Sequence, residues 1–97
     1  MKAKLTKAGM LIYWCEGCGH AHSIPAERWH FDGNLEKPTI DPSVRHFYRH
    51  PQTDAEVTTC HYLLKQGVMK FCGDCEHALK GQHRPLIDIH PDYKLPD

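Results

Sequence analysis

The sequence predicts an α+β fold that is mostly β, a small domain in which a zinc ion joins two knuckle hairpins and one short helix. Three observations support this prediction. Five cysteines stand in a chain of 97 residues, and four of them form two Cys-x-x-Cys pairs. The segments before both pairs have strand-like, apolar and aromatic composition. Leu, Ile, Val and Phe together number only 19 residues, so this thin core needs further support, commonly a disulfide set or a structural metal.

Chain length and charge limit the function classes. A chain of 97 residues supports one small core, so residues 1–97 are expected to form a single domain. Residues 1–9 are expected to be a loose or edge-strand arm, and residues 90–97 a loosely packed tail with two prolines. Twelve basic and twelve acidic residues give a net charge of zero. Nucleic-acid binding is therefore not favoured, because it usually depends on a basic excess.

Disulfide bonds are the alternative use of the cysteines. The cysteine count is odd, and the apolar run at residues 10–15 is too short for a secretory signal. No stretch approaches the ~20 apolar residues of a membrane span. We therefore expect a cytoplasmic protein with reduced thiols and no membrane contact.

The first Cys-x-x-Cys pair is predicted to lie in the turn of a hairpin. Residues 10–14 form an apolar, aromatic run typical of a strand, and residues 20–24 are predicted as the return strand. Gly17 and Gly19 can adopt the backbone angles that such a tight turn demands.

The middle of the chain has weaker signals. Asp32-Gly33 predicts a sharp bend. Residues 38–44 contain two prolines and are predicted as extended chain, on an edge or in an ordered loop. Residues 45–56 are charged and are predicted to be a surface loop.

The second pair is predicted to follow another hairpin. Residues 57–72 have strong β composition and turn at 65–67. Asp74 can cap a short helix over residues 75–80, which Gly81 would end. Residues 85–89 are predicted as the last strand.

The simplest zinc site consists of the four paired cysteines. Two Cys-x-x-Cys turns supply the four soft ligands that tetrahedral Zn²⁺ prefers, here Cys15, Cys18, Cys72 and Cys75. Surplus ligands remain close to them. Cys60 and His61 lie on the strand paired with residues 68–72, and His77 follows the second pair, so all three are alternative ligands.

A catalytic metal would need three protein ligands, an open position and usually a carboxylate base. Asp74, Glu76, Asp41 and Glu16 are candidate bases, and a second site rich in nitrogen ligands could use His20, His22, His61 and His77. The deaminase and His-Glu-x-x-His patterns are absent. A redox role would require a thioredoxin-like context, which is also absent. No catalytic residue is therefore assigned.

Four blocks carry a resemblance to a known family: Cys15–His20, residues 29–43, Cys60-His61 and residues 71–82. In this order they resemble a family of small proteins of unknown function that is frequent in phages and prophages. The resemblance covers most of residues 11–87. It implies a phage accessory protein, and it implies Cys60, His61 and His77 as ligands beside Cys15 and Cys18, with Asp74 also regular. Some members carry the label ammonia monooxygenase, which no copper-like or di-iron pattern supports here.

Two main hypotheses follow. The first is a non-enzymatic structural-zinc protein, phage-encoded, that contacts a host or phage protein. The second is a small zinc hydrolase with an open coordination position and Asp74 or a histidine in proton transfer. A third, weaker hypothesis is a nucleic-acid-binding zinc ribbon, which requires one basic face formed by Lys2, Lys4, Lys7, Arg28, Arg45, Arg49 and Lys70.

Overall fold

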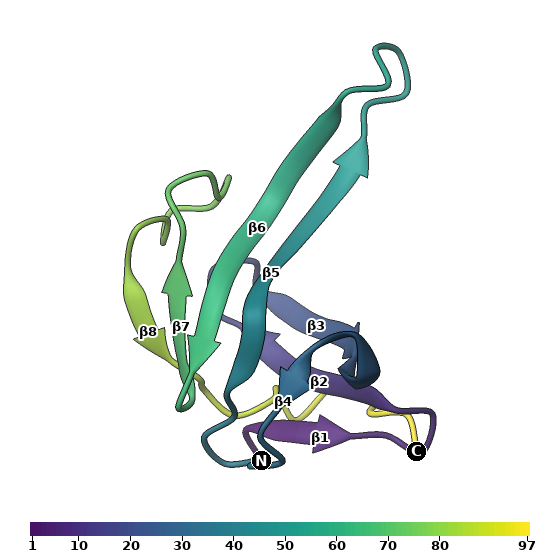
Figure 1. The fold of residues 1–97 in the computed structure, drawn as a ribbon, viewed down its shortest axis with the longest axis vertical. Helices are drawn as coiled ribbons and strands as arrows, with labels where there is room; N and C mark the ends of the chain where they lie inside the picture. The colour runs from purple at the N-terminus through teal and green to yellow at the C-terminus, as the bar shows by residue number, and fades with distance from the viewer.

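The computed structural model describes residues 1–97 and contains two antiparallel sheets (Figure 1). The first sheet has the order β1-β2-β3, with β1 (Ala3–Leu5), β2 (Met10–Cys15) and β3 (His20–Pro25). The second has the order β4-β5-β6-β7-β8, with β4 (His30–Phe31), β5 (Ile40–Arg49), β6 (Glu56–Lys65), β7 (Val68–Phe71) and β8 (His83–Pro85). One 3-10 turn, η1 (Ala26–Arg28), joins the sheets. None of these elements is a helix of the length and hydropathy that a membrane crossing needs.

The predicted α+β class is wrong, because the fold is nearly all β. The segment predicted as a short helix, residues 75–80, forms turns instead. Glu76 N–H donates to Thr59 O on β6 at 3.2 Å, and Gly81 N–H, just after the segment, donates to Phe71 O on β7 at 3.0 Å. A six-residue helix has little stability of its own, so these contacts decide its conformation.

Both predicted knuckle hairpins are confirmed as hairpins. β2 pairs with β3, and Cys15 lies opposite His20 at the turn that holds the first Cys-x-x-Cys pair. β6 pairs with β7, and Tyr62 lies opposite Phe71 just before the second pair. In the first turn, Gly19 adopts a φ of 71°, which favours glycine.

The surface loop predicted at residues 45–56 is confirmed only at residues 50–55 and is wrong at residues 45–49 and 56. β5 continues to Arg49 and β6 begins at Glu56, so the two strands project from the body as a long hairpin (Figure 1). Arg45 bonds to Glu56 across the strands at 2.9 Å, and Arg49 bonds to the same carboxylate at 3.3 Å. Charged residues therefore stabilise a solvent-exposed strand pair here, although their composition is typical of a loop.

Other boundaries differ less. Ile40 lies in β5 between β4 and β6, inside the sheet and not at its edge. The last strand is β8 at residues 83–85, not at residues 85–89. Within residues 1–9, β1 forms the edge of the first sheet.

The core lies between the two sheets. The first sheet contributes Leu11, Tyr13 and Ile24, and the second contributes a larger set: Ile40, Val44, Tyr62, Leu64, Met69 and Phe71. Tyr13 and Tyr62 join the sheets through a hydrogen bond between their buried hydroxyls. Burial raises the pKa of Tyr13, so this hydroxyl stays protonated. The contact places the end of β2 beside the middle of β6, where both candidate site groups lie.

Candidate functional site

Four potential metal ligands converge from three segments of the chain. We call Cys15, Cys18, Cys60 and His77 the metal group; their ligand atoms all lie within 4.8 Å of one another. Cys15 Sγ lies 3.9 Å from Cys60 Sγ, and Cys60 Sγ lies 3.3 Å from His77 Nε2. Zinc bonds of about 2.3 Å to sulfur and about 2.0 Å to nitrogen in a tetrahedron put such ligand atoms about 3.5 to 3.8 Å apart. The metal group therefore has the dimensions of a tetrahedral metal site.

The three sulfurs of the metal group shift one another's pKa values, because they lie close together and partly buried. The Cys60 thiol, hydrogen-bonded to Cys15, lowers the pKa of Cys15 to about 3, and the negative Cys15 in turn raises the pKa of Cys60. Burial raises the pKa of Cys18 to about 12, and the charge on Cys15 adds to this effect. The raised pKa values of Cys18 and Cys60 oppose their ionisation beside Cys15. A divalent cation would stabilise all three thiolates, because ligands bind a metal in their deprotonated form.

Gly17 makes room for one of the ligands. A β-carbon at Gly17 would overlap the imidazole ring of His77. Gly73, the glycine inside the second Cys-x-x-Cys pair, has no atom within 4 Å of such a β-carbon. The first turn is therefore shaped around His77, which arrives from the far end of the chain.

A second group joins a serine, a histidine and an aspartate, and we call Ser43, His61 and Asp74 the triad. Ser43 Oγ lies 3.2 Å from His61 Nε2, and His61 Nδ1 lies 3.0 Å from Asp74 Oδ1. In the tautomer that Asp74 favours, Nδ1–H donates to the carboxylate and Nε2 accepts from the Ser43 hydroxyl. Nucleophile, base and orienting carboxylate are thus connected in the order that serine hydrolases use.

Three separate segments position the triad. Ser43 lies on β5 beside a break in the β5–β6 register, between Ile40 and Val44. Such bulges redirect side chains and are frequent near active sites. His61 lies on β6, and Asp74 lies in the turn after β7. Trp29 Nε1–H donates to Ser43 O at 3.3 Å and fixes β5 at this point.

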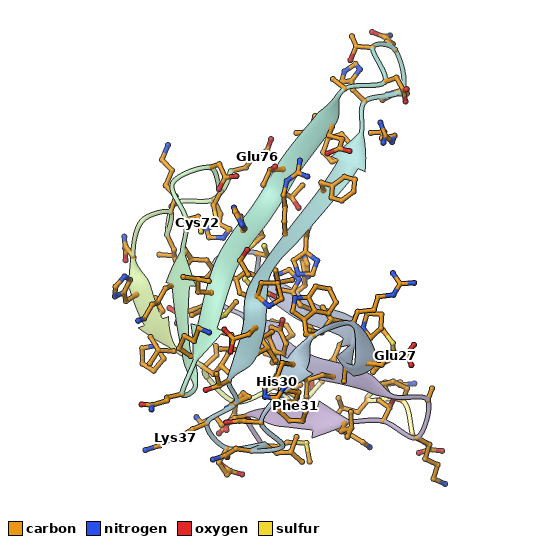
Figure 2. All side chains as sticks on the ribbon, viewed as in Figure 1. Glu27, His30, Phe31, Lys37, Cys72 and Glu76 are labelled. Atoms are coloured by element: carbon orange, nitrogen blue, oxygen red, sulfur yellow. The ribbon has the colours of Figure 1, made fainter.

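The main chain of His61 is held by the second Cys-x-x-Cys pair. The Cys75 thiol donates to His61 O at 3.0 Å and accepts from His61 N–H at 3.2 Å. Cys72 N–H donates to the same oxygen at 2.8 Å. Cys72 Sγ also lies within 4.8 Å of the ligand atoms of His61 and Asp74. Figure 2 shows Cys72 and Glu76 beside β6, far from Lys37 at the other end of the molecule.

The triad faces solvent. The Asp74 side chain is 52% exposed and that of His61 is 26% exposed. The two surface hollows lie around Gln66 and Val68 at the β6–β7 turn, and neither is lined by a triad residue. An open site of this kind is accessible to a large substrate.

The structure divides the predicted ligands between the two groups. Cys15 and Cys18 of the predicted four-cysteine set lie together with two of the alternative ligands, Cys60 and His77. The remaining residues, Cys72, Cys75 and His61, lie at the triad. Which of these residues bind a metal stays a prediction.

No role was predicted for Ser43 from the sequence. The chain has two serines, Ser23 and Ser43, and neither lies in a Gly-x-Ser-x-Gly motif that would mark a nucleophile. The residues that join Ser43 to His61 were predicted to be a loop, so no prediction placed the two side chains together. Only a strand predicted through residues 45–49 would have paired this segment with residues 56–65 and so brought Ser43 close to His61.

Comparison with known proteins identifies a family. The model of the family described as "BubE: Bacterial ubiquitination-like system serine protease" matches residues 2–72. The matched range contains Ser43 and His61 and ends before Asp74 and His77. No curated protein and no solved structure matches the chain. The matched family is described by a bacterial system, whereas the resemblance implied a phage family of unknown function. Because the match covers more than half of the sequence, the chain belongs to the BubE family.

Proposed function

We propose that this protein is a serine hydrolase of a ubiquitination-like system, with Ser43 as nucleophile, His61 as general base and Asp74 as the orienting carboxylate. The pair of hydrogen bonds that connects the three side chains, 3.2 Å and 3.0 Å long, carries the proposal. The description of the family as a serine protease supports the choice of a serine nucleophile.

The geometry supports a two-step acyl transfer. Ser43 Oγ attacks the carbonyl carbon of the substrate, and its proton passes to His61 Nε2. The Asp74 carboxylate accepts the hydrogen bond from Nδ1–H and stabilises the resulting imidazolium. The tetrahedral intermediate collapses, and the leaving group takes the proton from His61. Water, deprotonated by His61, then hydrolyses the acyl-enzyme and releases Ser43.

The substrate that fits best is a protein modified at its surface by a ubiquitin-like protein. The exposure of Asp74 and His61 suits a bond carried by a macromolecule, because a small ligand would need an enclosed pocket. The bond cleaved would be the one formed by the terminal carbonyl of the ubiquitin-like protein. The host or phage protein expected as a binding partner would then be the substrate.

Zinc in the metal group has a structural role in this proposal. Four protein ligands complete a tetrahedral shell and leave no position for a catalytic water. Three thiolates and one imidazole are the ligands that favour Zn²⁺ over hard cations. The reaction therefore needs no metal-bound nucleophile, because Ser43 supplies one.

Labelling with a fluorophosphonate probe tests the nucleophile. Ser43→Ala should abolish labelling and lower kcat against a ubiquitin-like fusion substrate by at least about 10³-fold. Ser23→Ala is the matched control, because Ser23 is the other serine of the chain and is exposed on β3. Labelling that survives in folded Ser43→Ala protein, or that fails equally in Ser23→Ala, would overturn the proposal.

A further inference from the structure

We infer that Cys75 is a positioning residue of the triad, whose thiol holds the main chain of His61 so that the imidazole bridges Ser43 and Asp74. This inference rests on the proposed serine hydrolase function. Cys75 touches no reacting atom in it, and it acts on the reaction through His61.

β6 is only partly paired at His61 on the side of β7, because Cys72 N–H donates to His61 O at 2.8 Å whereas His61 N–H meets the Cys75 sulfur and not a main-chain carbonyl. β7 pairs with β6 from Lys65 to Tyr62 and ends at Phe71, opposite Tyr62. The next residue of β6 on that side is His61. A backbone edge left without a partner inside a protein loses free energy and positional order.

The Cys75 thiol takes the place of the missing carbonyl partner. It accepts from His61 N–H at 3.2 Å, the bond that a strand carbonyl would otherwise make, and it donates to His61 O at 3.0 Å beside the bond from Cys72 N–H. A thiol can do both, because sulfur is a weak donor and a weak acceptor. Cys75 is 5% exposed, so water does not compete for these bonds.

The turn after β7 that carries Cys75 also carries Asp74. The Asp74 carboxylate bonds to His61 and makes no other hydrogen bond or ion pair. Its position therefore depends also on its two chain neighbours, Gly73 and Cys75, of which only Cys75 has a side chain that is bonded to the rest of the protein. One buried thiol thus fixes the base from its main chain and the carboxylate from the next residue.

Geometry separates Cys75 from the metal ligands. Its sulfur bonds to both main-chain polar groups of His61 and is not one of the four ligand atoms that converge in the metal group. The metal group has four members without it. Loss of the Cys75 thiol should therefore leave the metal in place and affect the reaction.

The experiment compares Cys75→Ala, Cys75→Ser and Cys72→Ala in the full-length, zinc-loaded protein. The Cys72→Ala control removes the other thiol of the same pair but keeps the amide that bonds to His61 O. Each protein is assayed for zinc per chain, melting temperature, kcat and KM, and for the rate at which the fluorophosphonate labels Ser43. Cys75→Ala should retain one zinc and lower kcat about 10²-fold with KM changed less than about twofold, as expected for a misplaced base. Cys75→Ser should recover most of this loss, because a hydroxyl also donates and accepts.

Three results would overturn the inference. They are an unchanged kcat in Cys75→Ala, an equal loss in Cys72→Ala, and loss of zinc in Cys75→Ala, which would make Cys75 a ligand. If Cys75→Ala does not fold, Cys75→Ser decides: a kcat about 10²-fold below that of the unmodified protein, at normal zinc content and melting temperature, would also refute the role. The unmodified protein is labelled in the same assay. If its Ser43 reacts with the fluorophosphonate, any of these three results refutes the role of Cys75 and leaves Ser43 as the nucleophile.

Discussion

The two Cys-x-x-Cys segments have the same spacing and different surroundings. Cys15 and Cys18 point toward Cys60 and His77, with distances that suit one metal ion. Cys75 bonds to the main chain of His61 instead. A Cys-x-x-Cys turn therefore limits the positions of its two sulfurs, whereas the segment packed against the turn determines which groups the sulfurs contact.

Removal of the ion should have the largest effect on the first segment. The metal group connects β2, β6 and the turn after β7, so the binding free energy becomes folding free energy, about 10 to 16 kcal/mol for structural zinc. We expect a strong chelator to abolish the cooperative melt measured by circular dichroism. An apoprotein that melts like the untreated protein would contradict a structural role for the ion.

Asp74→Asn should have the next largest effect, on the second segment. The amide can hold the imidazole only in the wrong tautomer, so kcat should fall by about 10⁴-fold while zinc content stays the same. The matched control is Glu76→Gln, an exposed carboxylate two residues away (Figure 2). An equal loss in the control would show that general charge, and not the Asp74–His61 bond, matters.

Replacing the glycine inside each Cys-x-x-Cys pair by alanine tests the difference between the two segments directly. Gly17→Ala places a β-carbon in the His77 ring, so it should weaken zinc binding and destabilise the fold by about 2 kcal/mol, as overpacking does. Gly73→Ala meets no atom within 4 Å and should bind zinc normally. Competition with a chromogenic chelator measures both affinities. Equal affinities would place His77 outside the metal site.

The smallest effect concerns acid stability near the core tyrosines. Burial lowers the pKa of His46 from 6.5 to about 4, so the folded protein binds fewer protons than the unfolded chain in this range. Stability should therefore be lost as the pH falls from about 6.5 toward 4. In His46→Asn the free energy of unfolding, measured with urea between pH 7 and pH 5, should decrease less steeply. Metal release at low pH would affect both proteins equally. Parallel plots of the unfolding free energy against pH would therefore contradict the lowered pKa of His46.

Sequence patterns correctly predicted those strands whose conformation depends on their own composition and on the turns beside them. The apolar run at residues 10–14 and the β-rich stretch at 57–72 are strands, because their composition and turns agree with their packing. The helix predicted at residues 75–80 is wrong, since the Glu76 amide bonds to Thr59 on β6, a residue remote in sequence. The loop predicted at residues 45–56 is wrong at residues 45–49, because the cross-strand ion pairs with Glu56 cannot be recognised before the strand register is known.

The candidate site was only partly accessible from the sequence for the same reason. Cys15, Cys18, Cys60 and His77 were all named as candidate ligands, but spacing alone could not choose them over Cys72 and Cys75. Asp74 and His61 were named as a base and as a ligand. Ser43 lies beside His61 only because of the β5–β6 register and its bulge. Its proposed role could therefore be recognised only in the three-dimensional structure.

Anomalous diffraction at the zinc edge would test the division of labour between the two segments most directly. We predict one peak per chain, surrounded by the side chains of residues 15, 18, 60 and 77, with the sulfur of Cys75 still bonded to His61. A peak bound by both Cys72 and Cys75 would contradict the account, because the Cys75 thiol assigned to the main chain of His61 would then be a metal ligand.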